Sequence, residues 1–325
     1  MLKAMIVGCG QIAGGINQSL NTHGGAYQVR DGVSIVACID TDQGRSHGFA
    51  ETFNCEVEKD LHKAIDKHQP DIISVCTPDS SHFFITEQIL QAKQKPKVIF
   101  LEKPACRKEE ELGHLIGLSE KAGVDIVVNH SRRFDQHHQQ LRDRIKAGEF
   151  GDLRSIYATY YSGWKHNGIH VIDSLSYLFC DSIVVDIVTK AWESPYEGDP
   201  TIELLASFKE QDAIIHLNGF DEKDYQFFEI DLRFNKSRLR LENFGERILL
   251  ETKIINEAGE NVIQMANIGL DNKTETSMQQ AVNLICQSIE DNNPVLLEGY
   301  LLQDVVETMN TIWQCKEEYE KYRFK

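Results

Sequence analysis

The chain has 325 residues, of which 41% are hydrophobic, and this is enough for two domains with full hydrophobic cores. Its formal net charge of −16 excludes the basic surface by which proteins bind nucleic acids or anionic membranes. The eight cysteines show neither a C-x-x-C pair nor metal-ligand spacing, and no run of 18 apolar residues indicates a membrane span. We therefore expect a cytoplasmic protein with no metal, no nucleic-acid partner and no membrane partner.

The first 129 residues alternate between apolar runs of strand length and helical patterns. The strand-like runs are residues 4–7, 33–39, 72–76, 98–101 and 124–128. Helical patterns between them include residues 61–67, 83–92 and 109–122. Continuous apolar strands that alternate with amphipathic helices form parallel sheets covered on both faces. Residues 1–129 are therefore predicted to form a doubly wound α/β domain.

The pattern changes in residues 130–325, which we predict to form an α+β domain with a large, mostly antiparallel, open-faced sheet. The predicted strands are residues 155–162, 183–189, 202–208, 213–220, 227–234, 238–242 and 248–255. Apolar and polar residues alternate clearly in the fifth of these, as expected for a sheet with one solvated face. The predicted helices are residues 168–179, 278–291 and 299–319.

A glycine turn follows the first strand and reads Gly8-Cys9-Gly10-Gln11-Ile12-Ala13. Gly8 permits a tight turn, and Gly10 lets the backbone approach the pyrophosphate of a dinucleotide. Ala13 occupies the third small position, and we expect the following helix to direct its N-terminal amides at the phosphates. Gln11 and Ile12 complete this predicted cofactor contact.

Asp40 closes the second strand, where a carboxylate can hold the hydroxyls of the adenosine ribose. Asp40 and Asp42 together would repel a 2′-phosphate, so NAD is favoured over NADP. Arg45 weakens this preference, because an arginine nearby can accept the phosphate.

Four further motifs keep a common order along the chain. They are Thr77-Pro78-Asp79-Ser80-Ser81-His82, Glu102-Lys103-Pro104, Asn129-His130-Ser131-Arg132-Arg133-Phe134-Asp135 and Gly168-Ile169-His170-Val171-Ile172-Asp173. With the glycine turn, they make the chain resemble the glucose–fructose oxidoreductase / inositol dehydrogenase / rhizopine-catabolism (Gfo/Idh/MocA) family. The resemblance spans the whole chain. It implies an NAD(P)-binding Rossmann domain and a second domain whose sheet often mediates homodimers or homotetramers.

The resemblance also implies hydride transfer between a nicotinamide and a carbon of a sugar, a sugar derivative or a cyclitol. Lys103 is then the first catalytic candidate, because an ammonium group stabilises the alkoxide that develops on the reacting oxygen. A cis peptide is implied between Lys103 and Pro104. Thr77, Pro78, His82 and Glu102 are predicted to contact the cofactor, without a proton-transfer role for His82.

His170 is the second catalytic candidate. At helical spacing it shares one stripe with Asp173, Ser174 and Tyr177, opposite an apolar stripe, so we expect it to project away from the core. It could act as the general base or acid. Inositol dehydrogenase-like members carry an aspartate four residues before this histidine, whereas this chain carries His166. Either Asp173 orients His170 instead, or Lys103 carries the proton transfer and both histidines bind substrate hydroxyls.

The remaining candidate substrate contacts are Arg132, Arg133, Trp164, Lys165, His166 and Asp173. The arginines could clamp a carboxylate or phosphate, or bridge the two domains through acidic partners. Trp164 could stack on a sugar or belong to the core. Two alternatives to a dehydrogenase or reductase stay open: an NAD-dependent glycosidase on the same fold, and a non-catalytic cofactor-binding sensor or regulator.

Overall fold

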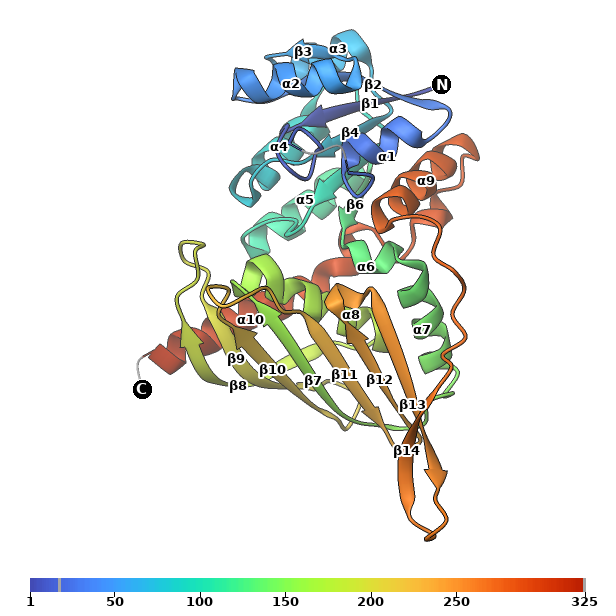
Figure 1. The fold of residues 1–325 in the computed structure, drawn as a ribbon. Helices are drawn as coiled ribbons and strands as arrows, with labels where there is room; N and C mark the ends of the chain where they lie inside the picture. Colours follow the sequence, from blue (N-terminus) through green and yellow to red (C-terminus); the bar gives the residue numbers. More distant parts are fainter. Residues whose placement is uncertain (17–18, 324–325) are drawn as a thin grey trace. The chain divides into compact units, whose positions relative to one another are not determined.

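The computed structural model describes residues 1–16 and 19–323, which form two compact units (Figure 1). The first unit combines residues 1–136 with 273–306, and the second combines residues 137–272 with 307–325. The domain boundary predicted after residue 129 lies seven residues before residue 136, where the chain first passes from the first unit to the second. The predicted and observed units differ in residues 273–306, which the prediction assigned to the second domain. They return to the first unit because apolar residues of helix α9 (Ser277–Glu290) join its core.

The first unit contains a six-stranded parallel sheet in the order β3-β2-β1-β4-β5-β6. Its strands are β1 (Leu2–Val7), β2 (Val33–Ile39), β3 (Glu56–Glu58), β4 (Ile72–Val75), β5 (Val98–Glu102) and β6 (Asp125–Asn129). This is the strand order of a dinucleotide-binding doubly wound sheet, so the predicted fold of this half is confirmed. Strand β3 was not predicted, because three residues with two glutamates carry no apolar pattern.

The helices of this unit are α1 (His23–Val29), α2 (Gln43–Phe53), α3 (Leu61–His68), α4 (Asp79–Gln91), α5 (Glu109–Ala122), α6 (Ser131–Phe134) and α9, with the short turns η3 (Pro294–Leu297) and η4 (Leu302–Val305). Every residue of β4 and β5 is buried, as expected for central strands covered on both faces. The strands β2, β1, β4 and β5 are neighbours and run in parallel. Their carboxyl ends therefore bring the predicted cofactor residues to one edge of the sheet.

The second unit contains an eight-stranded sheet in the order β14-β13-β12-β11-β7-β10-β9-β8 (Figure 1). Its strands are β7 (Leu153–Tyr161), β8 (Ile183–Trp192), β9 (Thr201–Phe208), β10 (Ile214–Phe220), β11 (Glu229–Phe234), β12 (Ser237–Glu242), β13 (Arg247–Ile255) and β14 (Asn261–Ala266). Only β7 and β10 pair in parallel, so the predicted, mostly antiparallel sheet is confirmed. The unpredicted β14 is almost fully exposed, and burial therefore imposes no alternation on its sequence.

The other elements of the second unit are α7 (Gln136–Lys146), the π-helical turn η1 (Trp164–Gly168), α8 (Ile169–Phe179), η2 (Asn243–Gly245) and α10 (Val306–Arg323). The helix predicted over residues 299–319 begins only at residue 306, because a turn and η4 precede it. In residues 1–16 and 19–323, no helix is both long and apolar enough to cross a membrane.

Candidate functional site

The glycine turn after β1 is required by a close approach between two loops. Gly8 has a φ of +91°, and a Cβ there would lie 2.7 Å from the backbone carbon of Cys76 and the nitrogen of Thr77. Only glycine tolerates both conditions. Gly10 differs, because across the part of the chain that the structure describes no atom lies within 4 Å of an added Cβ. The turn thus packs on one side and leaves open space beside Gly10, as a bound pyrophosphate would require.

The described residues that follow this turn, 14–16 and 19–22, do not form the expected helix. Helix α1 starts only at His23, and its first amides are used within the protein: His23 N donates to Ile12 O and Gly24 N to Ala13 O. The tight turn continues instead, because Gly15 N donates to Gly10 O and an added Cβ on Gly15 would lie 2.1 Å from the carbonyl oxygen of Cys9. The prediction that a helix N-terminus faces the phosphates is therefore wrong for α1.

The Asp40 carboxylate lies beside the glycine turn at the end of β2. Its Oδ2 accepts from Cys9 N at 2.7 Å and its Oδ1 accepts from Asp42 N at 2.8 Å. Each oxygen retains a second lone pair that could accept a ribose hydroxyl. The Asp42 carboxylate caps α2, and Arg45 Nε lies 3.7 Å from its Oδ2. Arg45, the residue that could accept the 2′-phosphate of NADP, thus lies near Asp42, the capping residue of its own helix.

Thr77 and His82 lie at the end of β4 and in α4, beside the glycine turn. Among residues 1–16 and 19–323, the buried hydroxyl of Thr77 has no hydrogen-bond partner, which fits a place for a bound cofactor atom. The His82 ring is buried, and its Nδ1 and Nε2 lie 2.7 Å from the carbonyl oxygens of Pro104 and Thr77. The implied cis peptide between Lys103 and Pro104 is confirmed.

Glu102, at the end of β5, is buried and supported by two residues to which the sequence assigned no role, Asn129 of the third motif and His23. Its Oε1 accepts from His23 Nε2 at 2.9 Å and from Asn129 Nδ2 at 2.6 Å. Burial alone would raise the pKa of this carboxyl, but the hydrogen bonds from His23 and Asn129 and the charge of Lys103 hold it below its ordinary value. Lys103 therefore follows a buried, ionised carboxylate. No local signal links residue 23 to residue 102.

This depressed pKa predicts how stability changes with acid. The carboxylate of Glu102 contributes stability fully above the unfolded-state pKa of about 4.3, and the contribution is lost as the pH falls through the lower folded value. On acidification from about pH 6 to about pH 3, the wild type should lose more unfolding free energy than Glu102→Gln. Denaturant melts of both proteins at several pH values measure this. A difference that does not change with pH would contradict the assignment.

Arg132 and Arg133 lie on α6 in the first unit. The guanidinium of Arg133 is buried and donates through Nη1 to the carbonyl oxygen of Gly299 at 2.8 Å. Arg133 therefore ties two segments of the same unit together, and its proposed role as an anion clamp is not supported by this contact. Arg132 is half-buried.

In the second unit, the start of η1 is held by one short segment, residues 199–201. Four consecutive backbone N–H groups, those of residues 163–166, donate to it. The acceptors are Thr201 Oγ1, Pro200 O and the two carboxylate oxygens of Asp199. Because the first amides of a helix lack partners within it, this segment caps η1 and α8 from outside. The turn that precedes His170 is thereby fixed.

Asp199 is the main residue of this site that sequence reasoning missed. It is buried, and its carboxylate accepts from Lys165 N at 2.7 Å and His166 N at 2.9 Å. The chain therefore does place a carboxylate beside residue 166, from a loop 33 residues away in sequence. The signal available was Gly198-Asp199-Pro200, which indicates only a turn.

Replacing Asp199 with alanine should destabilise the protein by about 1–3 kcal/mol, because the backbone amides of Lys165 and His166 lose their buried acceptor. It should also lower kcat, because the turn before His170 loosens. The matched control is Asp181→Ala, since the Asp181 carboxylate likewise accepts from backbone amides, at Ser182 and Gln211. Thermal melts and steady-state kinetics of both variants check this. Equal kcat in the two variants would refute a role for Asp199 in the site.

Helix α8 carries His170 but is buried more completely than its sequence predicts. Asp173, Ser174 and Tyr177, expected on a solvated stripe with His170, are all buried. Asp173 Oδ1 accepts from Thr308 of α10 at 3.1 Å, and the guanidinium of Arg142 of α7 lies over the Tyr177 ring. The stripe is therefore covered by other helices of the unit. His170 itself is half-buried.

Trp164 is a core residue. Its ring is 1% exposed, and its Nε1 donates to the carbonyl oxygen of Ile312 at 3.3 Å. Gly168 makes room for it, because a Cβ there would lie 2.6 Å from the indole. Of the two roles considered for Trp164, the structure supports the core role.

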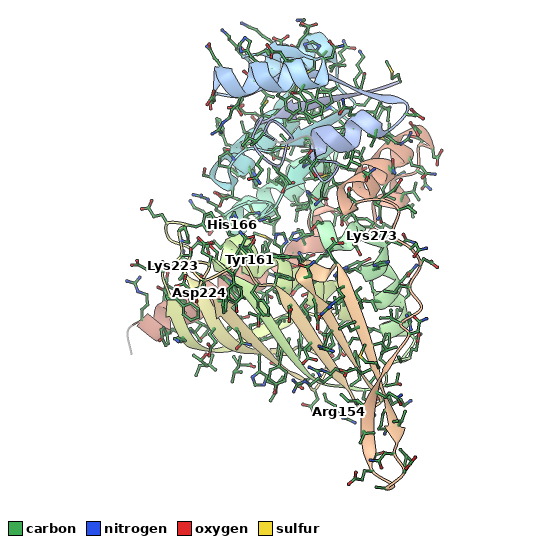
Figure 2. The ribbon with its side chains drawn as sticks, viewed as in Figure 1. Arg154, Tyr161, His166, Lys223, Asp224 and Lys273 are labelled. Carbon is green, nitrogen blue, oxygen red and sulfur yellow. The ribbon has the colours of Figure 1, made fainter. Side chains whose placement is uncertain are left out.

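Lys165 and His166 lie on the rim of the same turn. The exposed His166 ring stacks on Tyr196 with centroids 3.8 Å apart, and Lys165 Nζ donates to Gly198 O. Figure 2 shows Arg154 and Tyr161 at opposite ends of β7, with His166 at the Tyr161 end. A pocket of about 490 Å³ opens here, lined by Lys165, Tyr196, Lys316 and Tyr319 among others.

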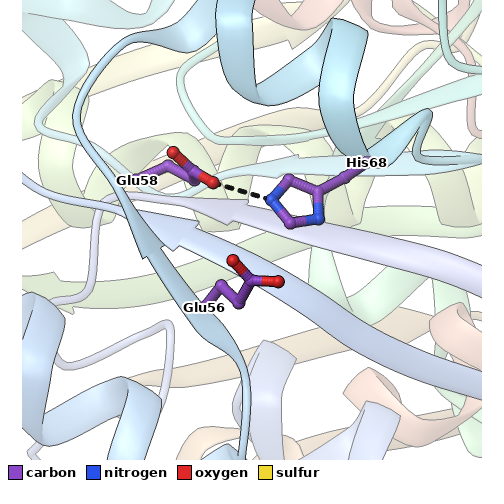
Figure 3. Close-up of side chains that lie close together, drawn as sticks. All are labelled: Glu56, Glu58 and His68. Carbon is purple, nitrogen blue, oxygen red and sulfur yellow. Dashed lines mark hydrogen bonds and ion pairs between the residues drawn. The ribbon is translucent and has the colours of Figure 1, made fainter.

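One group of side chains in the described ranges, Glu56, Glu58 and His68, has ligand atoms close enough to hold a metal ion (Figure 3). The ammonium group of Lys67 already balances the charge of these carboxylates, because its Nζ lies 2.6 Å from Glu56 Oε2 and 2.8 Å from Glu58 Oε1. His68 Nε2 lies 2.9 Å from Glu58 Oε1. The group is a surface ion-pair network, and we assign it no metal.

Comparison with known proteins gives the same family as the motifs. Residues 2–130 match the oxidoreductase family Gfo/Idh/MocA, which has an NAD-binding Rossmann fold. D-glucoside 3-dehydrogenase of Escherichia coli is 23% identical over 345 aligned positions, covering 94% of this chain and 93% of that protein. Inositol 2-dehydrogenase of Salmonella typhimurium is 26% identical over 165 positions, covering 50% of this chain and 46% of that protein.

The fold of the whole chain also recurs among solved structures. UDP-N-acetylglucosamine 3-dehydrogenase from Acidithiobacillus ferrooxidans superposes with a TM-score of 0.76 at 15% identity, over 98% of this chain and 96% of that one. The likeness therefore extends beyond the nucleotide-binding unit to the second sheet. At this identity it shows the fold alone.

Proposed function

Because residues 2–130 match the Gfo/Idh/MocA oxidoreductase family, which has an NAD-binding Rossmann fold, we propose that this chain transfers a hydride between a nicotinamide and a hydroxyl-bearing carbon of a sugar, sugar derivative or cyclitol. The observation that carries this proposal is Lys103, which directly follows the buried carboxylate at the end of β5. This edge of the sheet also carries the open glycine turn, Asp40 and the unpartnered Thr77 hydroxyl described above. Brought together at the carboxyl ends of parallel strands, these groups suit a dinucleotide and a reacting alcohol.

The residues of the chain supply binding, orientation and proton transfer. The bound nicotinamide would accept or donate the hydride. Lys103 hydrogen-bonds the reacting oxygen and stabilises the negative charge that develops there during oxidation. His170 takes the hydroxyl proton or, in reduction, returns it. Lys165, His166 and Arg132 are our remaining candidates for substrate hydroxyl or anionic groups, whereas Arg133 and Trp164 serve the structure. Asp173, on the same helix as His170, is our candidate for the carboxylate that orients this histidine.

We propose carbon 3 of a hexopyranoside as the first position to test. One relative that aligns over nearly the whole chain is a D-glucoside 3-dehydrogenase, and one structure that superposes on it is a UDP-N-acetylglucosamine 3-dehydrogenase. Free glucosides, nucleotide-linked sugars and inositols differ in charge and size. They therefore form a panel in which the preferred substrate shows which charge and size of substrate the second unit accepts.

We propose NAD as the preferred cofactor, because the Asp40 carboxylate at the end of β2, beside the glycine turn, could accept ribose hydroxyls and would repel a 2′-phosphate. We also propose a cytoplasmic location, since all eight cysteines, each in the described ranges, are free thiols. A homodimer or homotetramer through the second sheet is proposed from its polar and aromatic open face, where Tyr157 stacks on His216.

The test is a cofactor-absorbance screen of the purified full-length protein with NAD and NADP against this panel. Turnover with a sugar or cyclitol, with a higher kcat/KM for NAD, is the expected result. Release of an aglycone from a chromogenic glycoside without net NADH would indicate the glycosidase alternative. Nucleotide binding without turnover across the panel would indicate the sensor or regulator.

A further inference from the structure

The two chain neighbours of Lys103 are each held by a buried histidine from a different helix. His23 of α1 contacts the side chain of Glu102, and His82 of α4 contacts the carbonyl oxygen of Pro104. Both imidazoles are almost completely buried, at 0% and 1% exposure. We propose that His23 and His82 are positioning residues that set the charge environment and direction of Lys103. This inference rests on the proposed catalytic role of Lys103.

The His23 contact belongs to a chain of buried hydrogen-bonded side chains that connects α1, β4 and β5. Tyr27 OH lies 3.0 Å from Ser74 Oγ, Ser74 Oγ lies 3.0 Å from His23 Nδ1, and His23 Nε2 lies 2.9 Å from Glu102. The four side chains come from α1, β4 and β5, and all are buried. Burying this many polar groups costs folding free energy unless each one has a hydrogen-bond partner. The chain of hydrogen bonds is therefore a specific feature of this fold.

The donor directions in this chain are determined by its last member. An ionised carboxylate only accepts, so His23 must donate through Nε2–H to Glu102. His23 Nδ1 can then accept from the Ser74 hydroxyl, which in turn accepts from Tyr27. Burial raises the pKa of the Tyr27 hydroxyl, which keeps its proton available as the first donor. The chain thus directs a row of hydrogen-bond donors at Glu102 and keeps its negative charge beside Lys103.

The groups that face Glu102 support this assignment. They are His23 from α1, Asn129 from β6, Lys103 next to it, and the Cys76 thiol from the end of β4. Burial and then the negative charge of Glu102 raise the pKa of Cys76, so this thiol stays neutral. The negative charge of Glu102 therefore favours the charged form of the neighbouring Lys103.

The His82 contact fixes the other side of Lys103. Its ring lies between the carbonyl oxygens of Thr77 and Pro104, at 2.7 Å from each. It therefore joins the loop after β4 to the loop after β5. Since the side chain before Lys103 and the backbone after it are held by separate elements, small displacements of either histidine should change where the ammonium points.

The experiment compares His23→Leu, His82→Leu and Ser74→Ala with the wild type. The matched control is His114→Leu, because His114 makes the same kind of contact to Glu87 at 2.8 Å but is exposed. Kinetics are measured with the preferred substrate from the screen. The pKa of Lys103 is measured separately by NMR on lysine ¹³C-labelled protein without substrate, with Lys103→Met identifying the signal.

Loss of either histidine is expected to lower kcat by roughly 10- to 100-fold with KM and nucleotide affinity nearly unchanged. His23→Leu should also lower the measured pKa of Lys103, Ser74→Ala should lower it less, and His114→Leu should leave it unchanged. A wild-type Lys103 pKa and kcat in folded His23→Leu and His82→Leu would overturn the proposal. If those variants do not fold, Ser74→Ala decides it, and an unchanged Lys103 pKa there overturns it. If the wild type turns over no substrate, the proposed function fails, and the NMR titration alone supports or overturns the positioning role.

Discussion

Replacing Lys103 with methionine is expected to lower kcat by roughly 10²- to 10⁴-fold, the range by which a positioned acid, base or charge accelerates such a step. Methionine keeps most of the length of the side chain but removes the ammonium group. The affinity for the dinucleotide should change little, because the glycine turn and Asp40 belong to other strands of the sheet. Steady-state turnover and nucleotide titration, measured on the same preparation, separate the two effects.

The matched control is Lys97→Met, since Lys97 precedes β5 whereas Lys103 follows it. Lys97 lies at the amino end of the strand, is exposed and pairs with Asp71 at 3.3 Å. Its substitution removes the same charge at the other end of β5 and leaves the residues at the carboxyl ends of the strands unchanged. Comparable turnover in Lys97→Met and Lys103→Met would show that general charge, and not position, accounts for the loss.

The second large effect is expected at Gly10. An added methyl group points into open space in the described structure, so Gly10→Ala should fold with nearly unchanged stability. The same methyl would occupy the space that we assign to the pyrophosphate. Nucleotide affinity should therefore fall by about tenfold or more, which corresponds to about 1.4 kcal/mol per factor of ten.

Two other glycines calibrate this result. Gly8→Ala should destabilise the protein by at least about 1–3 kcal/mol, because its φ is positive and its methyl would collide with the backbone at Cys76 and Thr77. Gly48, within α2, also has open space around it in the described structure, and Gly48→Ala should raise stability by about 0.5–1 kcal/mol. Unchanged nucleotide affinity in a folded Gly10→Ala variant would contradict the placement of the pyrophosphate.

The parallel sheet could be predicted because its central strands are buried on both faces. Residues 72–76 and 98–101 therefore form short, almost continuous apolar runs, and their strand length and the helical patterns beside them identify them as strands. Elements without that constraint were missed. Strand β3 has three residues, and β14 is exposed, so neither is required to carry an apolar pattern. Helix α9 was found, but its membership of the first unit depends on which core its apolar side joins.

The candidate site divides in the same way. Glycines that must turn, an acid at a strand end and a lysine before proline are local signals, so Gly8, Gly10, Asp40 and Lys103 could be predicted. The delayed start of α1 could not, because hydrogen bonds from His23 and Gly24 to the glycine turn determine it.

By itself, the sequence predicted the fold class, which the structure confirms, and pointed to the family that residues 2–130 match and to Lys103 as the principal catalytic candidate. Periodicity and tight turns depend on residues that are close together in the sequence, so they can be predicted without a structure. Only the tertiary structure decided that Asp199 caps the turn before His170 and that His23 supports Glu102. Asp199 lies 33 residues from His166, whose amide it accepts from, and His23 lies 79 residues from Glu102, and no local pattern encodes such contacts. They exist because buried amides and carboxylates must find partners wherever the fold brings them.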